Sequence, residues 1–361
     1  MIYTIVEYDR FENFYPFSLN HAVFEVRSGA FSVLERFQHS INKDDDIVLI
    51  VRDQIKDLVC ERYPNLRVNP SIVPPSKVIC MNQEVGDLYE DTNLSNFNEM
   101  SWRVDEEIYL WSFKDPSVFD FDKKRFSMKK DVDLDSSCIL INKKNIYISS
   151  SSKISPGCIL DASDGPIIID DEVFIDIGAL IKGNTYIGKN SIINPGAKLR
   201  GNISIGPCCK IGGEIEDTIF HGYSNKQHDG YLGHSYIGEW VNLGANTNNS
   251  DLKNNYSNVK FKIGEKEIDT EQMFAGCMVG DYVKTGISTM INTGTYIGLG
   301  ANVFGAGFQN KFIPSFSWGK EDKTNVDKFL STLKIVKERR KKYLSKSEID
   351  FIKTFYNLNK L

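Results

Sequence analysis

Two of the chain's five histidines, His228 and His234, lie six positions apart in the segment SNKQHDGYLGHSYIGEW, residues 224–240. A neutral imidazole, with an unperturbed pKa of about 6.5, is suited to take a proton from a reacting group. A nearby carboxylate or amide would orient the ring and select its tautomer, and Asp251 or Asn255 offers such a group. These residues could support general acid–base chemistry, and the alternative is that His228 only forms hydrogen bonds within its loop.

A metal site is not expected among these histidines. His221, His228 and His234 follow one another at intervals of seven and six, which is not the spacing of two ligands on one helix, and no cysteine lies between them. We interpret His221 and His234 as loop or interface residues. The seven cysteines also lack the paired short spacings of a zinc site, which indicates reduced thiols that mostly pack inside the fold.

A six-residue repeat precedes the histidine segment. The period fits neither an α-helix, near 3.6, nor a strand, near 2. It fits a hexapeptide β-helix, in which each six residues form one side of a triangular coil and the aliphatic residue points inward. The repeated residues are Ile169, Ile175, Ile181, Ile187, Ile193, Leu199, Ile205 and Ile211.

The repeat breaks twice before it ends. It resumes at Ile237 and again near Thr285. We interpret residues 216–236 and 249–278 as two insertions, because insertions in a repeat array become surface loops that often carry binding function. Both could line one site.

The rest of the chain predicts two further parts. Short apolar runs such as IYTIVEY and DIVLIVRD, separated by a helical pattern around FSVLERFQHS, predict βα units and a parallel sheet. Apolar residues at helical spacing near Phe329 predict a C-terminal helix. We predict an α/β domain at 1–140, the coil at 141–318 and a helical extension at 319–361.

Composition limits the partners. A net charge of -5 gives no basic footprint for nucleic acid. No apolar stretch approaches the length of a membrane span, and the N-terminus lacks the layout of a signal peptide. We expect a cytoplasmic protein that binds neither nucleic acid nor a membrane.

The coil and the segment KQHDGYLGHSYIGEWVNLGAN together resemble the left-handed β-helix acyltransferases. The segment is similar to the acetyltransferase half of the bifunctional N-acetylglucosamine-1-phosphate uridyltransferase/glucosamine-1-phosphate acetyltransferase family. Nearly the whole chain resembles predicted sugar nucleotidyltransferases of the same two-part layout. The resemblance implies a left-handed parallel β-helix, acetyl-CoA as cosubstrate, a sugar phosphate or nucleotide-sugar carrying an amine as acceptor, and a homotrimer.

The resemblance also implies roles for single residues when the sequences are aligned on the YLG tripeptide. His228 falls on the catalytic general base, with Asp251 or Asn255 to orient it, whereas His234 stands where the family carries an acidic residue. The implied substrate contacts are Lys226, Tyr231, Asn242 and Lys260, the last on a lysine that contacts the sugar phosphate. The implied cofactor contacts are Ala245, Thr289 and Ala301.

The N-terminal segment FYPFSLNHAVFEVRSGAFSVLERF is similar to nucleotidyltransferases, but two features depart from that pattern. The loop EYDRFENFYPF has no glycine to cradle phosphates, and Asn82 and Gln83 stand where an acidic residue would hold Mg²⁺. We interpret the domain as a degenerate, Rossmann-like nucleotidyltransferase domain, with Mg²⁺ expected only if it is active. Arg27, near the family's phosphate position, is interpreted as a solvated surface residue.

Two other functions compete with acetyl transfer. One is a sugar-1-phosphate nucleotidyltransferase that makes a nucleotide-sugar. The other is a non-catalytic scaffold whose coil forms a trimer.

Overall fold

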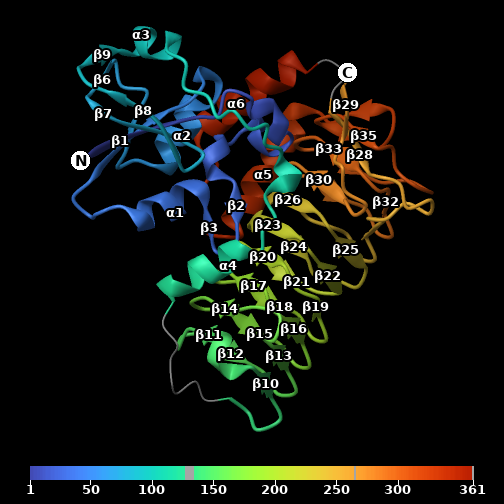
Figure 1. The fold of residues 1–361 in the computed structure, drawn as a ribbon. Helices are drawn as coiled ribbons and strands as arrows, with labels where there is room; N and C mark the ends of the chain where they lie inside the picture. Colours follow the sequence, from blue (N-terminus) through green and yellow to red (C-terminus); the bar gives the residue numbers. More distant parts are fainter. Residues whose placement is uncertain (127–133, 264–265, 360–361) are drawn as a thin grey trace. The chain divides into compact units, whose positions relative to one another are not determined.

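The computed structural model describes residues 1–126, 134–263 and 266–359, which divide into two compact units (Figure 1). Unit 1 comprises Met1–Val26, Phe31–Leu110 and the described chain from Lys334 onward. Unit 2 comprises Arg27–Ala30 and Trp111–Leu333. The predicted α/β region and β-helix are both confirmed, whereas the domain limits given above stay a prediction.

Unit 1 is built on a five-stranded sheet in the order β5-β4-β1-β7-β8. The first four strands are parallel and β8 pairs antiparallel with β7. Valine and isoleucine fill the central strands because both faces of a parallel sheet are covered. The strands are β1 (Ile2–Val6), β4 (Asp46–Ile50), β5 (Arg67–Val68), β7 (Ser76–Cys80) and β8 (Gln83–Leu88).

Several helices belong to unit 1 in the described part of the chain. In α1 (Val33–Ser40), Ser32 accepts a hydrogen bond from the Glu35 amide and the Glu35 side chain accepts one from the Ser32 amide, so a capping box starts the helix where the sequence predicts one. The others are α2 (Lys56–Arg62), α3 (Leu94–Glu99) and α6 (Lys346–Leu358). The unit also contains the strand β3 (Phe31–Ser32) and the antiparallel pair β6 (Ile72–Val73) and β9 (Thr92–Asn93).

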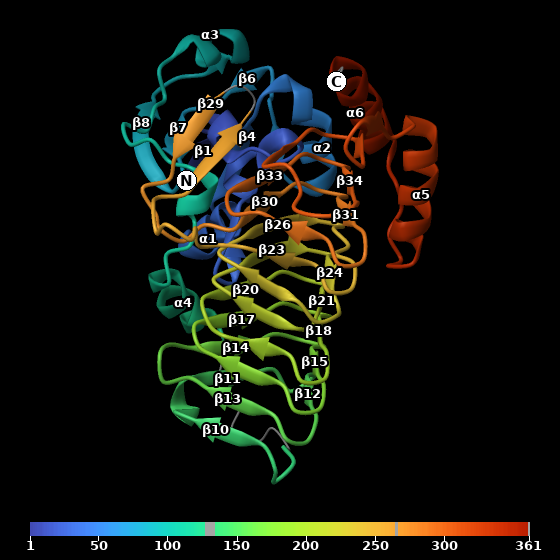
Figure 2. The same ribbon diagram turned by 90° about the vertical axis from the view of Figure 1, so that its right-hand side faces the viewer.

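Unit 2 is a left-handed β-helix whose short parallel strands stack into three faces (Figure 2). Face 1 contains β10 (Ile139–Ile141), β13 (Ile159–Asp161), β16 (Leu180–Lys182), β19 (Lys198–Leu199), β22 (Glu214–Glu216) and β25 (Tyr231–Gly233). Face 2 contains β11 (Ile146–Ile148), β14 (Ile167–Ile169), β17 (Thr185–Ile187), β20 (Ile203–Ile205), β23 (Ile219–Gly222), β26 (Tyr236–Glu239), β30 (Cys277–Val279), β33 (Thr295–Ile297) and β35 (Phe312–Ile313). Face 3 contains β12 (Lys153–Ile154), β15 (Phe174–Ile175), β18 (Ile192–Ile193), β21 (Lys210–Ile211) and β24 (Asn225–Lys226).

The coil continues beyond these strands. Two strands, β27 (Asn248–Asn249) and β32 (Met290–Ile291), pair with each other, and a further sheet contains β31 (Lys284–Thr285), β34 (Asn302–Val303), β36 (Ser317–Trp318) and β37 (Asp322–Lys323). The short strand β2 (Arg27–Ser28) and the helix α4 (Ser117–Asp122) also belong to unit 2, and α5 (Val326–Glu338) is the predicted helix around Phe329.

The repeated aliphatic residues form the core of the coil, as predicted. Ile193, Leu199, Ile205 and Ile211 are each at most 1% exposed and belong to one apolar cluster. In-register pairing aligns Ile193 with Ile211 on successive coils, so each side chain packs on its equivalent in the next coil. This stacking is why the six-residue period predicts the architecture.

The first predicted insertion is wrong. Residues 216–236 carry the strands β23, β24 and β25, which pair in register with the preceding coil. The inward positions here are Phe220, Lys226 and Leu232, each at most 2% exposed. The aliphatic period disappears because a phenylalanine and a lysine take these positions and the spacing shortens, while the coil itself continues.

The second predicted insertion is confirmed. The chain leaves the coil after β27 and returns at β30, and between them β28 (Lys260–Ile263) and β29 (Lys266–Asp269) pair antiparallel. Phe261 is 1% exposed and stacks on Trp111 with ring centroids 5.4 Å apart, which anchors this hairpin.

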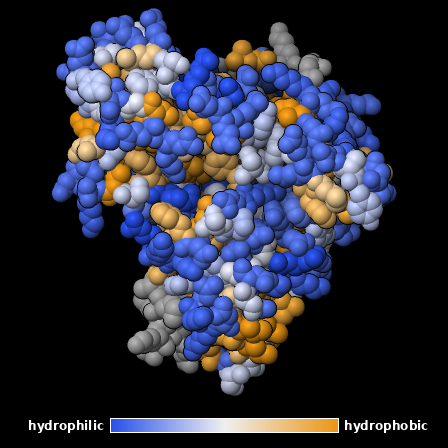
Figure 3. All heavy atoms as spheres, in the orientation of Figure 1, coloured by the Kyte–Doolittle hydropathy of each residue, from blue (hydrophilic) through white to orange (hydrophobic). Residues whose placement is uncertain are grey.

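Apolar side chains gather on the surface of the coil near β10, β13 and β16 (Figure 3). The exposed residues include Ile139, Ile141, Ile177 and Leu180. Among the described residues, no helix has the length and apolar character needed to cross a membrane. All seven cysteines carry free thiols, and four of them are buried.

Candidate functional site

One corner of the coil carries three of the predicted site residues. His228 lies in the turn between β24 and β25. The Asn246 amide donates to the carbonyl of Asp229, and the Ser288 amide donates to the carbonyl of Ala245, at 3.0 and 2.8 Å. His228, Ala245 and Thr289 therefore occupy the same corner in three successive coils.

His228 is exposed, and the structure gives its ring no orienting partner within the described chain. The side-chain oxygen of Asn255 instead accepts hydrogen bonds from the amide and hydroxyl of Ser257, at 3.2 and 3.0 Å. The side chain of Asp251 contacts His234 and Tyr231 instead of His228. The prediction that one of these two residues orients His228 therefore has no support in the hydrogen bonding.

Asp251 orients the other histidine of the segment. Its Oδ2 lies 2.8 Å from Nδ1 of His234 and accepts a hydrogen bond of 2.6 Å from the Tyr231 hydroxyl. The ring of His234 also stacks on Phe274, with centroids 5.2 Å apart. A carboxylate on one ring nitrogen and an aromatic ring on one face fix both the tilt and the tautomer of the imidazole.

The second insertion creates this arrangement. The chain departs from the coil at Asp251 and rejoins it at Phe274, where the Ala275 amide donates to the Asp251 carbonyl at 3.0 Å and the Gly276 amide donates to the His234 carbonyl at 2.8 Å. Both ends of the insertion therefore flank His234.

A glycine makes room for the hydrogen bonds. A Cβ atom at Gly233 would lie 2.2 Å from the Tyr231 hydroxyl oxygen and 2.3 Å from Oδ2 of Asp251, closer than real contacts allow. Position 233, the third residue of YLG, must therefore be glycine, because the side chains of Tyr231 and Asp251 approach its backbone closely.

The electrostatics keep Asp251 ionised. Burial raises the pKa of its carboxyl group, but hydrogen bonds from His234 and Tyr231 outweigh burial and lower the pKa below the ordinary value. The same burial and the Asp251 carboxylate raise the pKa of the Tyr231 hydroxyl, which therefore stays protonated.

A second carboxylate lies on the other side of Tyr231. Oε2 of Glu216 is 3.3 Å from the Tyr231 hydroxyl oxygen, and Arg200 pairs with Glu214 and Glu216 at 2.8 and 3.2 Å. The hydroxyl of the predicted sugar contact Tyr231 therefore lies close to two carboxylates, and one of them, Glu216, is paired with Arg200.

Lys226 occupies the interior of the coil. It is 2% exposed, stands in register with Ile211, and its ammonium donates to the carbonyls of Gly212 and His228 at 3.1 and 2.8 Å. Burial lowers the pKa of this ammonium to about 8, and the nearby Asp229 carboxylate partly offsets the effect. This position does not favour the predicted contact with a substrate, because the charged group points away from solvent and is held by the backbone.

The lowered pKa of Lys226 predicts a pH-dependent stability. Between about pH 8 and the unfolded pKa of 10.5, the unfolded chain holds a proton that the folded chain lacks, so the free energy of unfolding rises with pH. From pH 7.5 to 9.5 this group should contribute a rise of about 2 kcal/mol. Urea unfolding of Lys226→Met should lack that share of the rise, and Lys198→Met, at an exposed position of β19, should retain it. Equal pH dependence in both variants would contradict the assignment.

The remaining predicted residues lie at separate positions. Asn242 is exposed and its side-chain oxygen accepts a hydrogen bond of 3.3 Å from Asn225 on the preceding coil. Lys260 lies on the hairpin, with its ammonium 3.2 Å from Glu267. Thr289 and Ala301 are at most 1% exposed, so only their backbone could face a cofactor, and Ala301 lies in the apolar core of the coil.

Two interpretations from the sequence are wrong. Arg27 is buried rather than solvated: its side chain donates to the carbonyls of His221 and Ala30, at 3.3 and 2.6 Å. His221 lies within strand β23 rather than in a loop, and its ring is 3.3 Å from the Tyr236 hydroxyl. Both residues pack inside unit 2.

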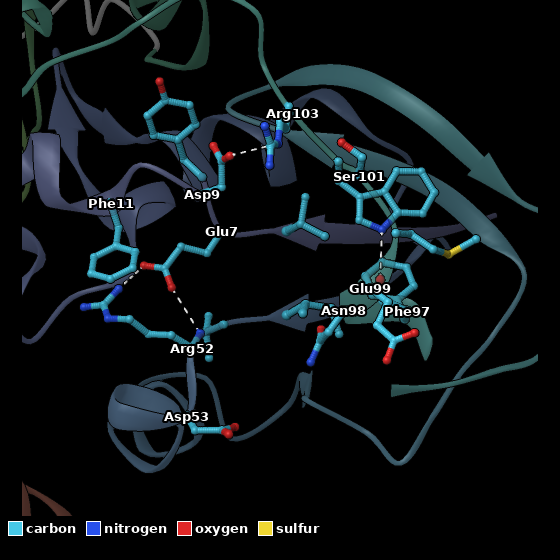
Figure 4. Close-up of a pocket in the computed structure, with 16 residues that line it drawn as sticks. Glu7, Asp9, Phe11, Arg52, Asp53, Phe97, Asn98, Glu99, Ser101 and Arg103 are labelled. Carbon is cyan, nitrogen blue, oxygen red and sulfur yellow. Dashed lines mark hydrogen bonds and ion pairs between the residues drawn. The ribbon is translucent and has the colours of Figure 1, made fainter. Parts of the chain in front are cut away.

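Unit 1 carries its own pocket of about 480 Å³ at the carboxyl ends of β1 and β4 (Figure 4). Ligands of open parallel sheets bind at this edge. The Glu7 carboxylate, which is buried beside the pocket, accepts hydrogen bonds from the amides of Val23 and Arg52, at 3.2 and 3.1 Å, and pairs with the Arg52 guanidinium. At the rim, Arg103 pairs with Asp9 at 3.3 Å.

The pairing of His234 with Asp251 was missed in the sequence. A signal was present, since His234 replaces an acidic residue of the resembled family and Asp251 follows seventeen positions later, about one turn of the coil at this point. The register of Glu216 with Gly233 shows the same interval of seventeen. An interval of one coil turn, used for polar as well as aliphatic residues, would have predicted that His234 and Asp251 are neighbours.

Comparison with known proteins gives related sequences for parts of the chain. Residues 3–150 match a family model described as "Sugar nucleotidyl transferase". A bifunctional sugar-1-phosphate nucleotidylyltransferase/acetyltransferase of Sulfurisphaera tokodaii is 33% identical over 149 residues, which cover 41% of this chain and 37% of the relative. A bifunctional protein GlmU of Acaryochloris marina is 31% identical over 158 residues, covering 43% and 29%. The chain thus spans only about a third of the length of these relatives.

A solved structure with a similar trace is the UDP-N-acetylglucosamine acyltransferase from Campylobacter jejuni. It is 13% identical, covers 62% of this chain and 83% of that chain, and has a TM-score of 0.27. A likeness this distant carries no argument about activity. The resemblance predicted from the sequence is nevertheless confirmed: residues 3–150 match the sugar nucleotidyl transferase family, and the chain is similar in sequence to bifunctional sugar nucleotidylyltransferase/acetyltransferase proteins.

Proposed function

We propose that unit 2 transfers the acetyl group of acetyl-CoA to the amine of an amino sugar, carried as a phosphate or as a nucleotide conjugate. The observation that supports this most is the corner formed by His228, Ala245 and Thr289 in successive coils. These are residues for which the resemblance implies catalysis and cofactor contact. Tyr231, Asn242 and Lys260 remain the proposed contacts to the sugar.

The proposed acetyl transfer requires one group that accepts a proton. The amine attacks the thioester carbonyl, and the nitrogen must lose a proton as the tetrahedral intermediate forms, which a neutral imidazole can accept. The resemblance implies His228 for this role. Its exposed ring could reach a substrate bound on the surface of the coil.

Several features of the proposal follow the resemblance and stay predictions. Acetyl-CoA would lie against the backbone near Ala245 and Thr289. The chain would assemble as a homotrimer in the cytoplasm. The α/β domain, predicted at residues 1–140, would bind a substrate, a partner or no small molecule, and would not catalyse nucleotidyl transfer, so Mg²⁺ has no part in the proposed reaction.

A second candidate is nucleotidyl transfer, which the family match over residues 3–150 favours. The third, a trimeric scaffold without activity, is favoured by no particular contact. The two candidate enzyme activities release different products: acetyl transfer releases the free thiol of coenzyme A, and nucleotidyl transfer releases pyrophosphate.

We expect thiol release when the protein is incubated with acetyl-CoA and an amino sugar, and the panel should contain glucosamine 1-phosphate and nucleotide-linked amino sugars. Release should depend on the amine, so the corresponding N-acetylated sugars are the matched controls. The thiol is read with a chromogenic disulfide and the acetylated product by mass. Absence of amine-dependent release across the panel would reject acetyl transfer.

A further inference from the structure

We propose that Lys226 is a positioning residue for His228: its ammonium, inside the coil, fixes the turn of residues 226–230 that carries the proposed general base. The inference rests on the proposed function and gives Lys226 a part in that reaction without contact to the substrate. The resemblance implies instead that Lys226 contacts the sugar, so the two assignments give different expectations for kcat and KM.

Lys226 interrupts an apolar column inside the coil. The strand register places Ile175, Ile193, Ile211 and Lys226 at equivalent positions of successive coils. The three isoleucines are 0% exposed and Lys226 is 2% exposed. Burial of an ammonium costs free energy that burial of an isoleucine does not, and residues that break a packing rule are expected where function requires them. The lysine therefore has a role beyond filling the coil.

Every carbonyl in the turn of residues 226–230 accepts a hydrogen bond. In the described chain, the donor to the His228 carbonyl is the Lys226 ammonium, at 2.8 Å. The other carbonyls accept from residues of other coils: Lys226 from the Gly212 amide at 2.6 Å, Gln227 from Nδ2 of Asn194 at 2.8 Å, Asp229 from the Asn246 amide at 3.0 Å and Gly230 from the Glu214 amide at 3.2 Å. The backbone of His228 is thus the part of the turn that this lysine holds.

The same ammonium ties the turn to the preceding coil. It also donates to the Gly212 carbonyl at 3.1 Å. A Cβ atom at Gly213 would lie 2.7 Å from Nζ of Lys226 and 2.8 Å from the His228 carbonyl oxygen, so glycine leaves room for these bonds. Hydrogen bonds from an ionised donor are stronger than neutral ones. The turn is therefore held from inside the coil, where a substrate cannot displace the donor.

A fixed backbone at His228 limits where its imidazole can lie. A general base must come within hydrogen-bond reach of the attacking nitrogen, and a displacement of about 1 Å can lower the rate about 100-fold. Loss of the Lys226 ammonium should therefore slow the chemical step. It should leave the binding of acetyl-CoA, proposed near Ala245 and Thr289, largely unchanged.

The first test measures kcat and KM of Lys226→Met in the full chain under the acetyl transfer assay. Methionine fills the volume of the lysine stem but donates no hydrogen bond. We expect kcat to fall about 10-fold to 100-fold, with KM for both substrates changed by less than about threefold. The matched control is Ile175→Ala, in the same column but away from the turn, which should lower the melting temperature and leave kcat near the wild-type value.

Hydrogen exchange followed by mass spectrometry reads the order of the turn directly. The amides of Gly212, Glu214 and Asn246 donate to the turn, so the peptides that contain them report whether it is held. These peptides should exchange faster in Lys226→Met than in the wild type or in Ile175→Ala. The measurement needs no substrate.

The pH profile of the wild type separates positioning from stability. Burial lowers the pKa of the Lys226 ammonium to about 8, against the Asp229 carboxylate. His228 is the other titratable side chain of the turn, and the neighbours in the column, Ile211 and Leu243, carry no charge. Above about pH 8 the neutral amine forms weaker hydrogen bonds, so kcat should fall toward that of Lys226→Met. The contribution of this group to the free energy of unfolding rises over the same range, so a rate that merely followed stability would not fall.

The outcomes separate this inference from the proposed function. Wild-type kcat and unchanged exchange in a folded Lys226→Met protein would overturn the inference and leave acetyl transfer intact, as would a higher KM for the sugar with kcat unchanged. If Lys226→Met does not fold, a wild-type kcat that stays level above pH 8 would overturn it. A wild-type chain that acetylates no amine would reject the proposed function, and the role of Lys226 in it would fall as well.

Discussion

No pyrophosphate should be released when the protein is incubated with N-acetylglucosamine 1-phosphate and any of the common nucleoside triphosphates. The reason lies in the pocket at the carboxyl ends of β1 and β4, where a phosphate-binding site needs free amides and cations. Here the amides of Val23 and Arg52 both donate to the Glu7 carboxylate, so an anion of the chain itself already takes these donors.

The cations near this pocket are engaged as well. The Arg52 guanidinium pairs with Glu7 and donates to the carbonyls of Ser18 and His21. Arg103 pairs with Asp9. Asp53 and Glu99, which also line the pocket, are exposed carboxylates that add negative charge. A triphosphate entering this pocket would meet repulsion rather than a cradle.

The expected Mg²⁺ position also lacks an acidic ligand. Asn82 and Gln83 are exposed at the turn between β7 and β8, and neutral amides hold Mg²⁺ poorly compared with carboxylates. A bifunctional relative assayed in parallel provides the positive control. Release of pyrophosphate with even a single triphosphate would show that the pocket binds nucleotide and that the interpretation of a degenerate domain is mistaken.

The architecture of the coil could be predicted because one physical rule repeats. Each aliphatic residue from Ile169 to Ile211 packs on its equivalent one coil away, so the period in the sequence is the period in space. The rule failed at residues 216–236, where Lys226 takes an inward position. A lysine can do so because two backbone carbonyls accept its ammonium, and those carbonyls belong to turns whose geometry no local pattern reveals.

The candidate site around His228 and His234 was also predictable only in part, because its contacts depend on how distant parts of the chain fold together. Asp251 was expected to orient a histidine, but the choice between His228 and His234 depends on where the second insertion leaves and rejoins the coil. Arg27 was misjudged because the carbonyl of His221, which accepts a hydrogen bond from its side chain, is a backbone group 194 positions away that folding brings to it. Contacts to backbone at long sequence separation leave no residue-type signal.

Light scattering should report a particle of three times 41.0 kDa. A single triangular coil buries its apolar residues inside and offers only shallow outer grooves, whereas neighbouring coils would form deep clefts that enclose a substrate. The exposed residues Ile139, Ile141, Ile177 and Leu180 near β10 and β16 form an apolar area that a second coil could cover. Closed three-fold symmetry would satisfy all such contacts without an open edge.

A charge placed in this apolar area should dissociate the trimer and abolish acetyl transfer. Ile177, 57% exposed on the coil, is the residue to change, because Ile177→Glu would bury a carboxylate in the contact while leaving the coil's own core untouched. Ile72→Glu is the matched control, since Ile72 is 46% exposed and lies in unit 1. A wild-type monomer at working concentration would refute the trimer. Full activity in a monomeric Ile177→Glu protein would show that the site is complete within one chain, with no group such as Lys260 supplied by a neighbour.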